Sequence, residues 1–283
     1  MSYISFQDVY FSYQGSSDDS VRAVNGVSLD IEKGKVTAIL GRNGSGKSTM
    51  AKLINGLLLP VKGKVYVDGI DTMDEDRLWD IRSQVGMIFQ NPDNQIVGTT
   101  VEEDVAFGPE NLGVPYDELH RRVADAISQV GMTEYAKSAP NMLSGGQKQR
   151  VSIAGILAMN TDCIVMDEST AMLDPAGRRD ILDLVMSLNR DKGITVIMIT
   201  HFMDEAALAD KVVVMGDGLI LEQGTPKEVF AHRDLAIKAG LDLPPVNNIL
   251  FELSKTFKDI DITALTMDEA SEQVVKALGQ DNI

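Results

Sequence analysis

Residues 34–58 read GKVTAILGRNGSGKSTMAKLINGLL, and this stretch decides the fold class. Its first part, residues 34–40, is a short β-rich run, and residues 48–58 have the composition of a helix. A strand, a glycine-rich loop and a helix in this order are typical of nucleotide-binding α/β domains. We therefore predict an α/β protein with parallel strands at its centre.

The loop within this stretch, GRNGSGKST at residues 41–49, fits the phosphate-binding pattern G-x-x-x-x-G-K-[ST]. Its glycines allow backbone N–H groups to wrap around phosphate oxygens. Lys47 can reach the β- and γ-phosphates, and Ser48 offers a hydroxyl to Mg²⁺. A chance glycine-rich turn is not expected between a strand and a helix. The predicted nucleotide-binding residues here are Gly41, Arg42, Asn43, Gly44, Ser45, Gly46, Lys47, Ser48 and Thr49.

Two acidic residues end a second apolar run, CIVMDE at residues 163–168. This run and ITVIMIT at residues 194–200 lack period-two alternation, which is typical of central parallel strands covered on both faces. A carboxylate at the end of such a strand can hold Mg²⁺, which suits Asp167. The next carboxylate, Glu168, could polarise an attacking water. The alternative is a pair of solvated acids, which the phosphate loop disfavours.

Three other side chains are candidates for the same site. His201 directly follows ITVIMIT, where ligands bind at the edge of open parallel sheets, although a structural histidine is the alternative. Gln90 also follows a strand-like run and could contact both a metal ion and water, or could be an exposed turn residue. Tyr13 precedes the phosphate loop and could stack on a base, with core packing beside Phe11 as the alternative.

The middle of the chain has helical character. In NMLSGGQKQR, residues 141–150, a Ser-Gly-Gly turn opens a helix and forms a second candidate anion site. In YDELHRRVADAISQVG, residues 116–131, Gly131 stands at a helix C-terminal cap position. One face of that helix is apolar and comprises Leu119, Val123, Ala126, Ile127 and Val130. We predict a helical insert over about residues 95–158.

The C-terminal part contains a hairpin and further helices. KVVVMGDGLILEQG, residues 211–224, indicates a hairpin around Gly-Asp-Gly. The capping boxes TPKE at residues 225–228 and TMDE at residues 266–269 predict two helix starts. Pro244-Pro245 interrupts the chain before the apolar-spaced VNNILFELSK. Residues 232–283 are therefore expected to form a small helical appendage.

Composition limits the class of protein. The 283 residues include 42 Asp and Glu against 26 Lys and Arg, a formal charge of −16 that disfavours nucleic acid as a ligand and favours solubility. The single cysteine, Cys163, cannot form an internal disulfide and is expected in the core. We expect no signal peptide, and no apolar stretch reaches the ~18 residues of a membrane helix. We expect a cytoplasmic protein that reaches any membrane through a partner.

Seven short motifs in order resemble the nucleotide-binding subunits of ATP-binding cassette proteins. They are FSY, GRNGSGKST, FQ, LSGGQ, CIVMDE, LDP and ITH, and the resemblance covers about residues 3–230. It implies a P-loop NTPase domain over residues 1–231, with a RecA-like parallel-sheet core, an antiparallel β-subdomain and a helical signature subdomain. It also implies an ATPase that works as a head-to-tail pair, each ATP lying between the phosphate loop of one subunit and the LSGGQ loop of the other.

The resemblance assigns roles to individual residues. At the subunit's own nucleotide, Tyr13 stacks on adenine, and Lys47 and Ser48 bind phosphate and Mg²⁺. Asp167 and Gln90 support the metal, and Gln90 also couples the site to the partner protein. Glu168 acts as the general base, and His201 senses the γ-phosphate. For the nucleotide of the opposite subunit the roles are γ-phosphate capping by Ser144, Gly145 and Gly146, and interface crossing by Asp174. Gln147 of the same loop is also expected to bind that nucleotide.

A narrower resemblance lies in FQNPDNQIVGTTVEEDVAFGPENLGVP, residues 89–115. This segment is similar to the ATPases of energy-coupling factor transporters, which import vitamins and, in one branch, cobalt and nickel ions. There an ATPase pair drives a transmembrane coupling protein, which carries a small substrate-binding membrane protein. The acidic residues Glu102, Glu103 and Asp104 could meet basic residues of that partner or form a solvated face. The extension at residues 232–283 also fits this group, where it helps join the two ATPases.

Two departures from the family pattern bear on the partner. Ser-Thr follows Glu168 where many relatives have Pro-Thr, and the crossing loop at residues 171–175 reads AMLDP where a small residue such as glycine often precedes leucine. Within the energy-coupling group the chain resembles the first of two non-identical ATPases. This implies a heterodimer, with a homodimer as the alternative.

The predicted function is ATP hydrolysis that powers import, at the cytoplasmic face of the membrane. One alternative is the ATPase of another ATP-binding cassette importer or exporter. A soluble cassette protein of DNA repair or translation is disfavoured by the single cassette, the lack of a sustained heptad repeat and the acidity. An unrelated phosphate-loop kinase or GTPase would leave LSGGQ and His201 unexplained. Membrane partners choose the transported solute, so the sequence does not identify it.

Overall fold

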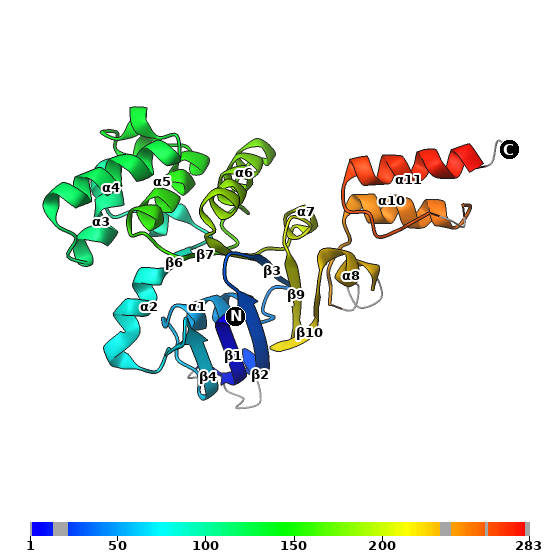
Figure 1. The fold of residues 1–283 in the computed structure, drawn as a ribbon, viewed down its shortest axis with the longest axis horizontal. Coiled ribbons are helices and arrows are strands. Elements are labelled where there is room, and N and C mark those ends of the chain that lie inside the picture. Colours follow the sequence, from blue (N-terminus) through cyan, green and yellow to red (C-terminus); the bar gives the residue numbers. More distant parts are fainter. Residues whose placement is uncertain (1, 14–21, 233–238, 258–259, 281–283) are drawn as a thin grey trace.

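The computed structural model describes residues 2–13, 22–232, 239–257 and 260–280, and two β-sheets form its body (Figure 1). In this part of the chain the larger sheet has six strands in the order β10-β9-β3-β8-β7-β6, and the smaller has four in the order β2-β1-β4-β5. The larger sheet contains β3 (Val36–Gly41), β6 (Val85–Ile88), β7 (Cys163–Asp167), β8 (Thr195–Ile199), β9 (Lys211–Gly216) and β10 (Leu219–Gly224). The smaller, antiparallel sheet contains β1 (Ser2–Phe11), β2 (Val24–Glu32), β4 (Lys62–Val67) and β5 (Ile70–Asp71). The predicted α/β class is confirmed.

The central strands of the larger sheet explain its apolar runs. Strands β3, β8 and β7 are parallel neighbours, and every residue in them is buried, including Cys163. Burial on both faces removes the alternation of polar and apolar residues. In the ladders Ile199 pairs with both Ile39 and Asp167, so the three strands end at the same edge. This edge carries the phosphate loop, the two carboxylates and His201.

Three helices form the predicted helical insert: α3 (Val101–Asn111), α4 (Tyr116–Gln129) and α5 (Gly145–Ala158). They pack on one another at one end of the molecule (Figure 1). All five residues of the predicted apolar face are buried, and Gly131 has a φ of 70°, as expected for a glycine after a helix end. The other helices are α1 (Lys47–Ile54), α2 (Leu78–Gln84), α6 (Pro175–Lys192), α7 (Met203–Ala206), α8 (Pro226–Ala231), α10 (Pro245–Ser254) and α11 (Met267–Gln280). None of the described helices is long and apolar enough to cross a bilayer.

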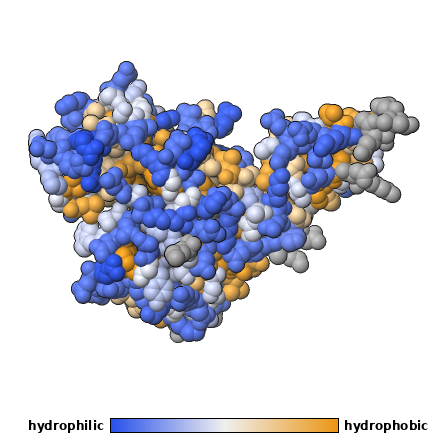
Figure 2. Space-filling model, viewed as in Figure 1, coloured by the Kyte–Doolittle hydropathy of each residue, from blue (hydrophilic) through white to orange (hydrophobic). Residues whose placement is uncertain are grey.

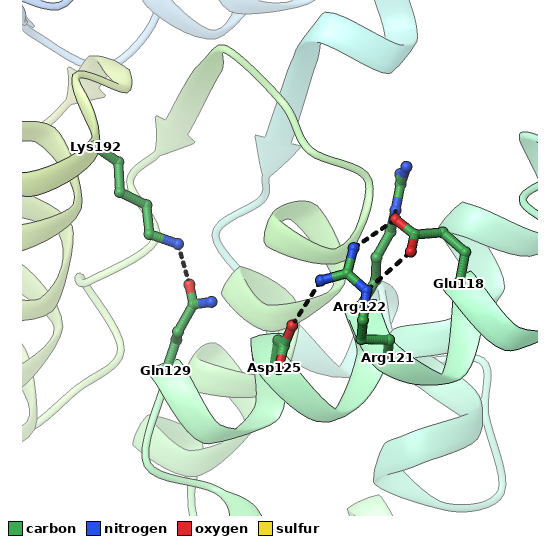
Figure 3. A network of polar contacts seen from close by, with 6 residues as sticks. All are labelled: Glu118, Arg121, Arg122, Asp125, Gln129 and Lys192. Atoms are coloured by element: carbon green, nitrogen blue, oxygen red, sulfur yellow. Dashed lines mark hydrogen bonds and ion pairs between the residues drawn. The ribbon is translucent and has the colours of Figure 1, made fainter.

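The outer face of α4 carries a network of charged side chains (Figure 3). Arg121 forms ion pairs with Glu118 and Asp125, with N···O distances of 2.7 and 3.2 Å. Exposed pairs of this kind contribute little to stability, because water and salt screen the charges. Lys192, at the end of α6, donates a hydrogen bond to Gln129. This last contact joins the helical insert to the sheet-bearing part of the chain.

The helix pair α10–α11 stands apart from the two sheets (Figure 1) and has its own small core. That core consists of Val246, Leu250, Ile260, Ala264, Ala270 and Ala277. The segment before it, Ala239–Leu243, instead contributes leucine and alanine side chains to the main core. Hydrophobic side chains also lie on the surface of the pair (Figure 2), where Ile249, Met267 and Val275 are more than half exposed.

The two predicted capping boxes differ in detail. The box at the start of α8 is complete. At α11 the Thr266 hydroxyl accepts a hydrogen bond from the Glu269 N–H at 3.2 Å, as expected. The Glu269 carboxylate also accepts from the Leu265 N–H at 2.8 Å and pairs with Lys227 of α8 at 2.8 Å. The glutamate of the second box therefore also ties the helix pair to α8.

Candidate functional site

The phosphate loop leaves β3 at Gly41 and enters α1 at Lys47, as predicted. The buried Lys47 Nζ donates to the carbonyl oxygens of Gly41 and Arg42 at 2.8 and 3.0 Å. Gly46 has a φ of 102°, and a Cβ there would lie 2.1 Å from the Ala23 carbonyl oxygen, so glycine is required. The loop therefore holds the lysine ammonium in place with backbone acceptors, in a position where phosphate oxygens can bind it.

Ser48 and Asp167 join the first turn of α1 to the end of β7. The Ser48 Oγ donates to the Asp167 Oδ1 at 2.7 Å. Burial raises the pKa of Asp167, and the hydrogen bond from Ser48 partly opposes that rise. Gln90 lines the same cavity and adds an amide oxygen. Hydroxyl, carboxylate and amide oxygens are the ligands that Mg²⁺ accepts, so these residues fit that ion.

Glu168 lies between Lys47 and Gln90. Its Oε1 is 3.7 Å from the Lys47 Nζ, and its Oε2 accepts a hydrogen bond from the Gln90 Nε2 at 3.5 Å. Its φ of 51° is in the left-handed region, which is costly for a non-glycine residue and is often found at functional sites. The Glu168 N–H donates to the Ile199 carbonyl at 2.9 Å, which fixes this turn against β8. The carboxylate consequently faces the cavity.

Replacing Asp167 by asparagine is expected to raise the melting temperature of the protein without ligand. Because burial raises the folded-state pKa of Asp167, ionisation of this group opposes folding once the pH exceeds its ordinary value. Asparagine removes the buried charge, keeps an acceptor for Ser48 and leaves Glu168 to pair with Lys47. Thermal unfolding at pH 7 measures the effect. The matched control is Asp162→Asn, an exposed acid, and a lower melting temperature for Asp167→Asn than for this control would contradict the explanation.

These groups line one cavity of about 750 Å³. It brings together Tyr13, Gln90, Asp167 and Glu168 with Asn43, Gly44, Gly46, Lys47, Ser48 and Thr49 of the phosphate loop. Gly41, Arg42 and Ser45 shape the loop without lining the cavity. Four lining residues were not predicted: Arg22, Ala23, Asn25 and Asp217. They come from the approach to β2 and from the turn of the β9–β10 hairpin, and no local pattern distinguishes them.

Tyr13 is half-exposed at the mouth of this cavity rather than packed in the core. Its ring meets the buried Phe11 ring edge-on at 5.0 Å, and its hydroxyl is 3.1 Å from the Thr49 Oγ1. The two aromatic rings therefore contact each other, but only Phe11 is a core residue. One face of an aromatic ring at a phosphate-loop cavity is a suitable platform for a base.

The Ser-Gly-Gly turn lies outside this cavity. It lines a separate hollow of about 240 Å³ with Asp174, the N-cap residue of α6. Ser144 and Gln147 form a complete capping box, in which the Ser144 N–H donates to the Gln147 Oε1 at 2.9 Å. Gly145 and Gly146 also line the hollow. The phosphate loop and the Ser-Gly-Gly turn of this chain thus line two separate cavities.

His201 follows β8 and is exposed at the sheet edge beside the cavity rather than among its lining residues. Its ring lies 4.1 Å from the Phe202 ring. Since Glu168 is bonded to Ile199, two residues before His201, the two side chains leave the sheet at adjacent strand ends. The structure therefore places His201 near the phosphate site without a contact to it.

The three acidic residues at the start of α3 are engaged within the chain. Glu103 completes a capping box with Thr100, and Asp104 accepts hydrogen bonds from the N–H groups of Val97 and Gly98 at 2.7 and 2.9 Å. The third, Glu102, forms an ion pair with a lysine at 3.0 Å. These carboxylates are therefore held by contacts within the chain, which the sequence did not predict.

A glycine-rich loop, a buried lysine, a serine–aspartate pair and an adjacent glutamate define the site of a phosphate-loop nucleoside triphosphatase. Residues 24–171 match the family model for the ABC transporter. The energy-coupling factor transporter ATP-binding protein EcfA1 of Clostridium perfringens is 52% identical over 267 residues, which cover 94% of this chain and 95% of that protein.

Solved structures agree with this match. The structure of cbiO1 from Clostridium perfringens, part of the ABC transporter complex cbiONQ, has a TM-score of 0.75 and 37% identity, covering 88% of this chain and 99% of that chain. A dimeric ATP-binding cassette in a post-hydrolysis state, bound to ADP and Pi, has a TM-score of 0.71 and 32% identity. The match covers 79% of this chain and 98% of that chain. The chain belongs to the ATP-binding cassette transporter family, in the group of energy-coupling factor transporter ATP-binding proteins. It is an ATP-hydrolysing subunit of a transporter.

Proposed function

We propose that this chain closes on a second, non-identical ATPase around ATP and thereby drives import of vitamins or transition-metal ions. The observation that carries the proposal is the separation of its two half-sites. Lys47 and the phosphate loop line one cavity, whereas Ser144 and Asp174 line another, so one chain cannot enclose a single nucleotide with both. Head-to-tail pairing brings each phosphate loop to the Ser-Gly-Gly turn of the other subunit.

Within such a pair we assign ATP handling to the side chains at the sheet edge. Tyr13 stacks on adenine, Lys47 binds the β- and γ-phosphates, and Glu168 takes a proton from the attacking water. Ser48, Asp167 and Gln90 would hold Mg²⁺, which neutralises phosphate charge when bound. His201 senses the γ-phosphate.

From the opposite subunit, the amide groups of the Ser-Gly-Gly turn stabilise the γ-phosphate of the same nucleotide, and Asp174 crosses the interface. Gly145 and Gly146 supply the turn, and Gln147 completes its capping box. With these assignments ATP binding stabilises the closed pair of subunits, because both subunits bind the same triphosphate.

A groove between the core and the helical insert is the proposed docking site for the transmembrane coupling protein. Its volume is about 510 Å³, and it is lined by residues of α2, α3, α5 and the segment after β6, among them both apolar side chains and polar ones such as Arg82 and Asp104. Trp79, Val97 and Phe107 are each more than half exposed there. Gln95 also lines the groove, and its Nε2 donates to the Phe89 carbonyl at 3.1 Å, next to Gln90. The groove is therefore connected to the ATP site through a short loop.

Replacing Phe107 by aspartate is expected to uncouple the ATPase from its membrane partners. The buried charge would disfavour an apolar helix in the groove, so co-purification of the complex and solute uptake should fall by about tenfold or more. ATP binding by the chain alone should not change, because Phe107 does not line the nucleotide cavity. Tyr116→Asp, an exposed aromatic residue on α4, is the control. Equal uptake by both variants would argue against this docking site.

The exposed apolar side chains of α10–α11 support a role for this helix pair in joining the two ATPases. Ala239, Leu241 and Leu243, which precede it in the sequence, pack in the main core, and α8 holds it through the Lys227–Glu269 ion pair. We place the assembly at the cytoplasmic face of the membrane, held there by the coupling protein and a substrate-binding membrane protein.

Purification of the chain with its native membrane partners, followed by uptake assays in proteoliposomes, tests the proposed function. We expect a second ATPase, a coupling protein and a small substrate-binding protein in the complex, with ATP-dependent uptake of a vitamin or a transition-metal ion. A complex that depends on a separate soluble binding protein, or that exports its solute, would point to another cassette transporter class.

A further inference from the structure

Glu205 is a buried carboxylate that none of the proposed ATP-handling steps uses. It lies in α7, four residues after His201, and is 2% exposed. An ionised carboxylate is costly to bury unless hydrogen bonds and a counter-charge compensate for lost water. A helix of four residues does not need such a group for its own stability. The partners of Glu205 therefore indicate what the residue does.

The carboxylate is bound by side chains from two other segments. The Thr170 Oγ1 donates to the Glu205 Oε1 at 2.6 Å, and the Arg178 Nε lies 4.0 Å from the same oxygen. Burial raises the pKa of Glu205, and hydrogen bonds from Thr170 and Thr200 together with the charge of Arg178 oppose this rise. Thr170 and Thr200 are themselves buried, so the contact is closed to solvent.

Each partner belongs to a segment that carries a proposed catalytic or interface residue. Thr170 lies two residues after Glu168, in a turn closed by the bond from the Ala171 N–H to the Glu168 carbonyl at 3.0 Å. The backbone N–H of Arg178 donates to the Asp174 carbonyl at 2.9 Å.

The guanidinium of Arg178 also lies 3.4 Å above the ring of Phe202. The Phe202 ring is in turn 4.1 Å from that of His201. Arg178 therefore connects the segment of Asp174 to the segment of His201, and Glu205 contacts both Arg178 and Thr170.

We propose that Glu205 is a positioning residue for ATP hydrolysis, which fixes the Glu168–Asp174 loop relative to His201 by binding Thr170 and Arg178. The inference rests on the proposed roles of Glu168 and His201. Because Glu205 does not line the nucleotide cavity, its loss should change the placement of the reacting groups and not ATP binding. Misplacement of catalytic groups by about 1 Å can cost about 10²-fold in rate.

The test compares kcat and the KM for ATP of the assembled transporter complex for Glu205→Gln, Glu205→Ala, Thr170→Val and Thr170→Ser. Gln keeps an acceptor for Thr170 but loses the charge near Arg178, Val removes the donor, and Ser keeps it. We expect kcat to fall by about tenfold or more for Glu205→Ala and Thr170→Val, with KM within about threefold of wild type. Thr170→Ser should recover most of the wild-type kcat.

Two controls separate positioning from folding and from failure of the proposed roles. Glu222→Gln alters another mostly buried carboxylate, on β10, outside the catalytic segments, and should leave kcat unchanged. If Glu205→Ala does not fold, Glu205→Gln and Thr170→Val decide the question. Wild-type kcat in these two variants, or a parallel loss of kcat, ATP affinity and melting temperature, would overturn the inference. If Glu168→Gln, assayed beside them, retains turnover, the proposed base assignment fails instead.

Discussion

Replacing Glu168 by glutamine is expected to lower ATP turnover by about 10²–10⁴-fold, the usual contribution of a positioned general base. The variant should still bind ATP and pair with the second ATPase. Glutamine is isosteric and can keep the contact with Gln90, but its neutral amide cannot accept a proton from water. The strained backbone at Glu168, with its φ of 51°, does not depend on the charge and should persist.

Single-turnover and steady-state hydrolysis by the assembled complex, together with ATP-dependent association of the subunits, measure this prediction. Asp162→Asn is a suitable control because it removes an exposed acid at the opposite end of β7. Turnover near that of the wild-type complex would show that another group activates the water. Loss of ATP-dependent association would instead assign Glu168 to nucleotide binding.

Replacing Ser144 by arginine is expected to leave ATP binding by the isolated chain unchanged and to abolish hydrolysis at the composite site that uses this chain's Ser-Gly-Gly turn. Ser144 lies in a different hollow from Lys47, so a bulky side chain there cannot reach the chain's own nucleotide. In the pair it would fill the space of the γ-phosphate and break the Ser144–Gln147 capping box. Removal of preorganised amide donors of this kind costs about 10²–10³-fold in rate.

The effect is clearest in a Lys47→Ala background, where the chain's own phosphate loop no longer holds ATP. Paired with a wild-type second ATPase, this variant should keep the hydrolysis of the one remaining composite site. Addition of Ser144→Arg should then remove that activity. Unchanged activity in the double variant would mean that the Ser-Gly-Gly turn does not act on the partner's nucleotide.

The sequence predicts the central part of the fold well, because strands buried on both faces leave continuous apolar runs. Residues 163–167 and 195–199 are strands at nearly the predicted bounds. The antiparallel sheet is harder to place from local pattern. Its long strand β1 has irregular pairing with β2 and a left-handed residue at Asp8, which disturb the alternation expected of a half-buried strand. The short helix α7 contains too few residues for periodicity to predict it.

The candidate site can be predicted where one short segment contains both the reactive side chains and the loop that positions them, as at Lys47 and Ser48. Arg22 and Asp217 were missed because only the pairing of distant strands brings them to the cavity. Glu205 could not be recognised for a similar reason. A lone glutamate in HFMDEA resembles a solvated helix residue, and only the packing of α6 and α7 shows it to be buried.

If a catalytic site requires two subunits, the specific ATPase activity of this chain must depend on its assembly with the second ATPase. ATP turnover per chain would be measured while the concentration of the second ATPase increases, with the assembled fraction determined in parallel by light scattering. We predict that the isolated, monomeric chain binds ATP but hydrolyses it poorly, and that turnover rises in proportion to the assembled fraction. Full turnover per chain in dilute, monomeric protein would show that one chain alone forms a complete catalytic site.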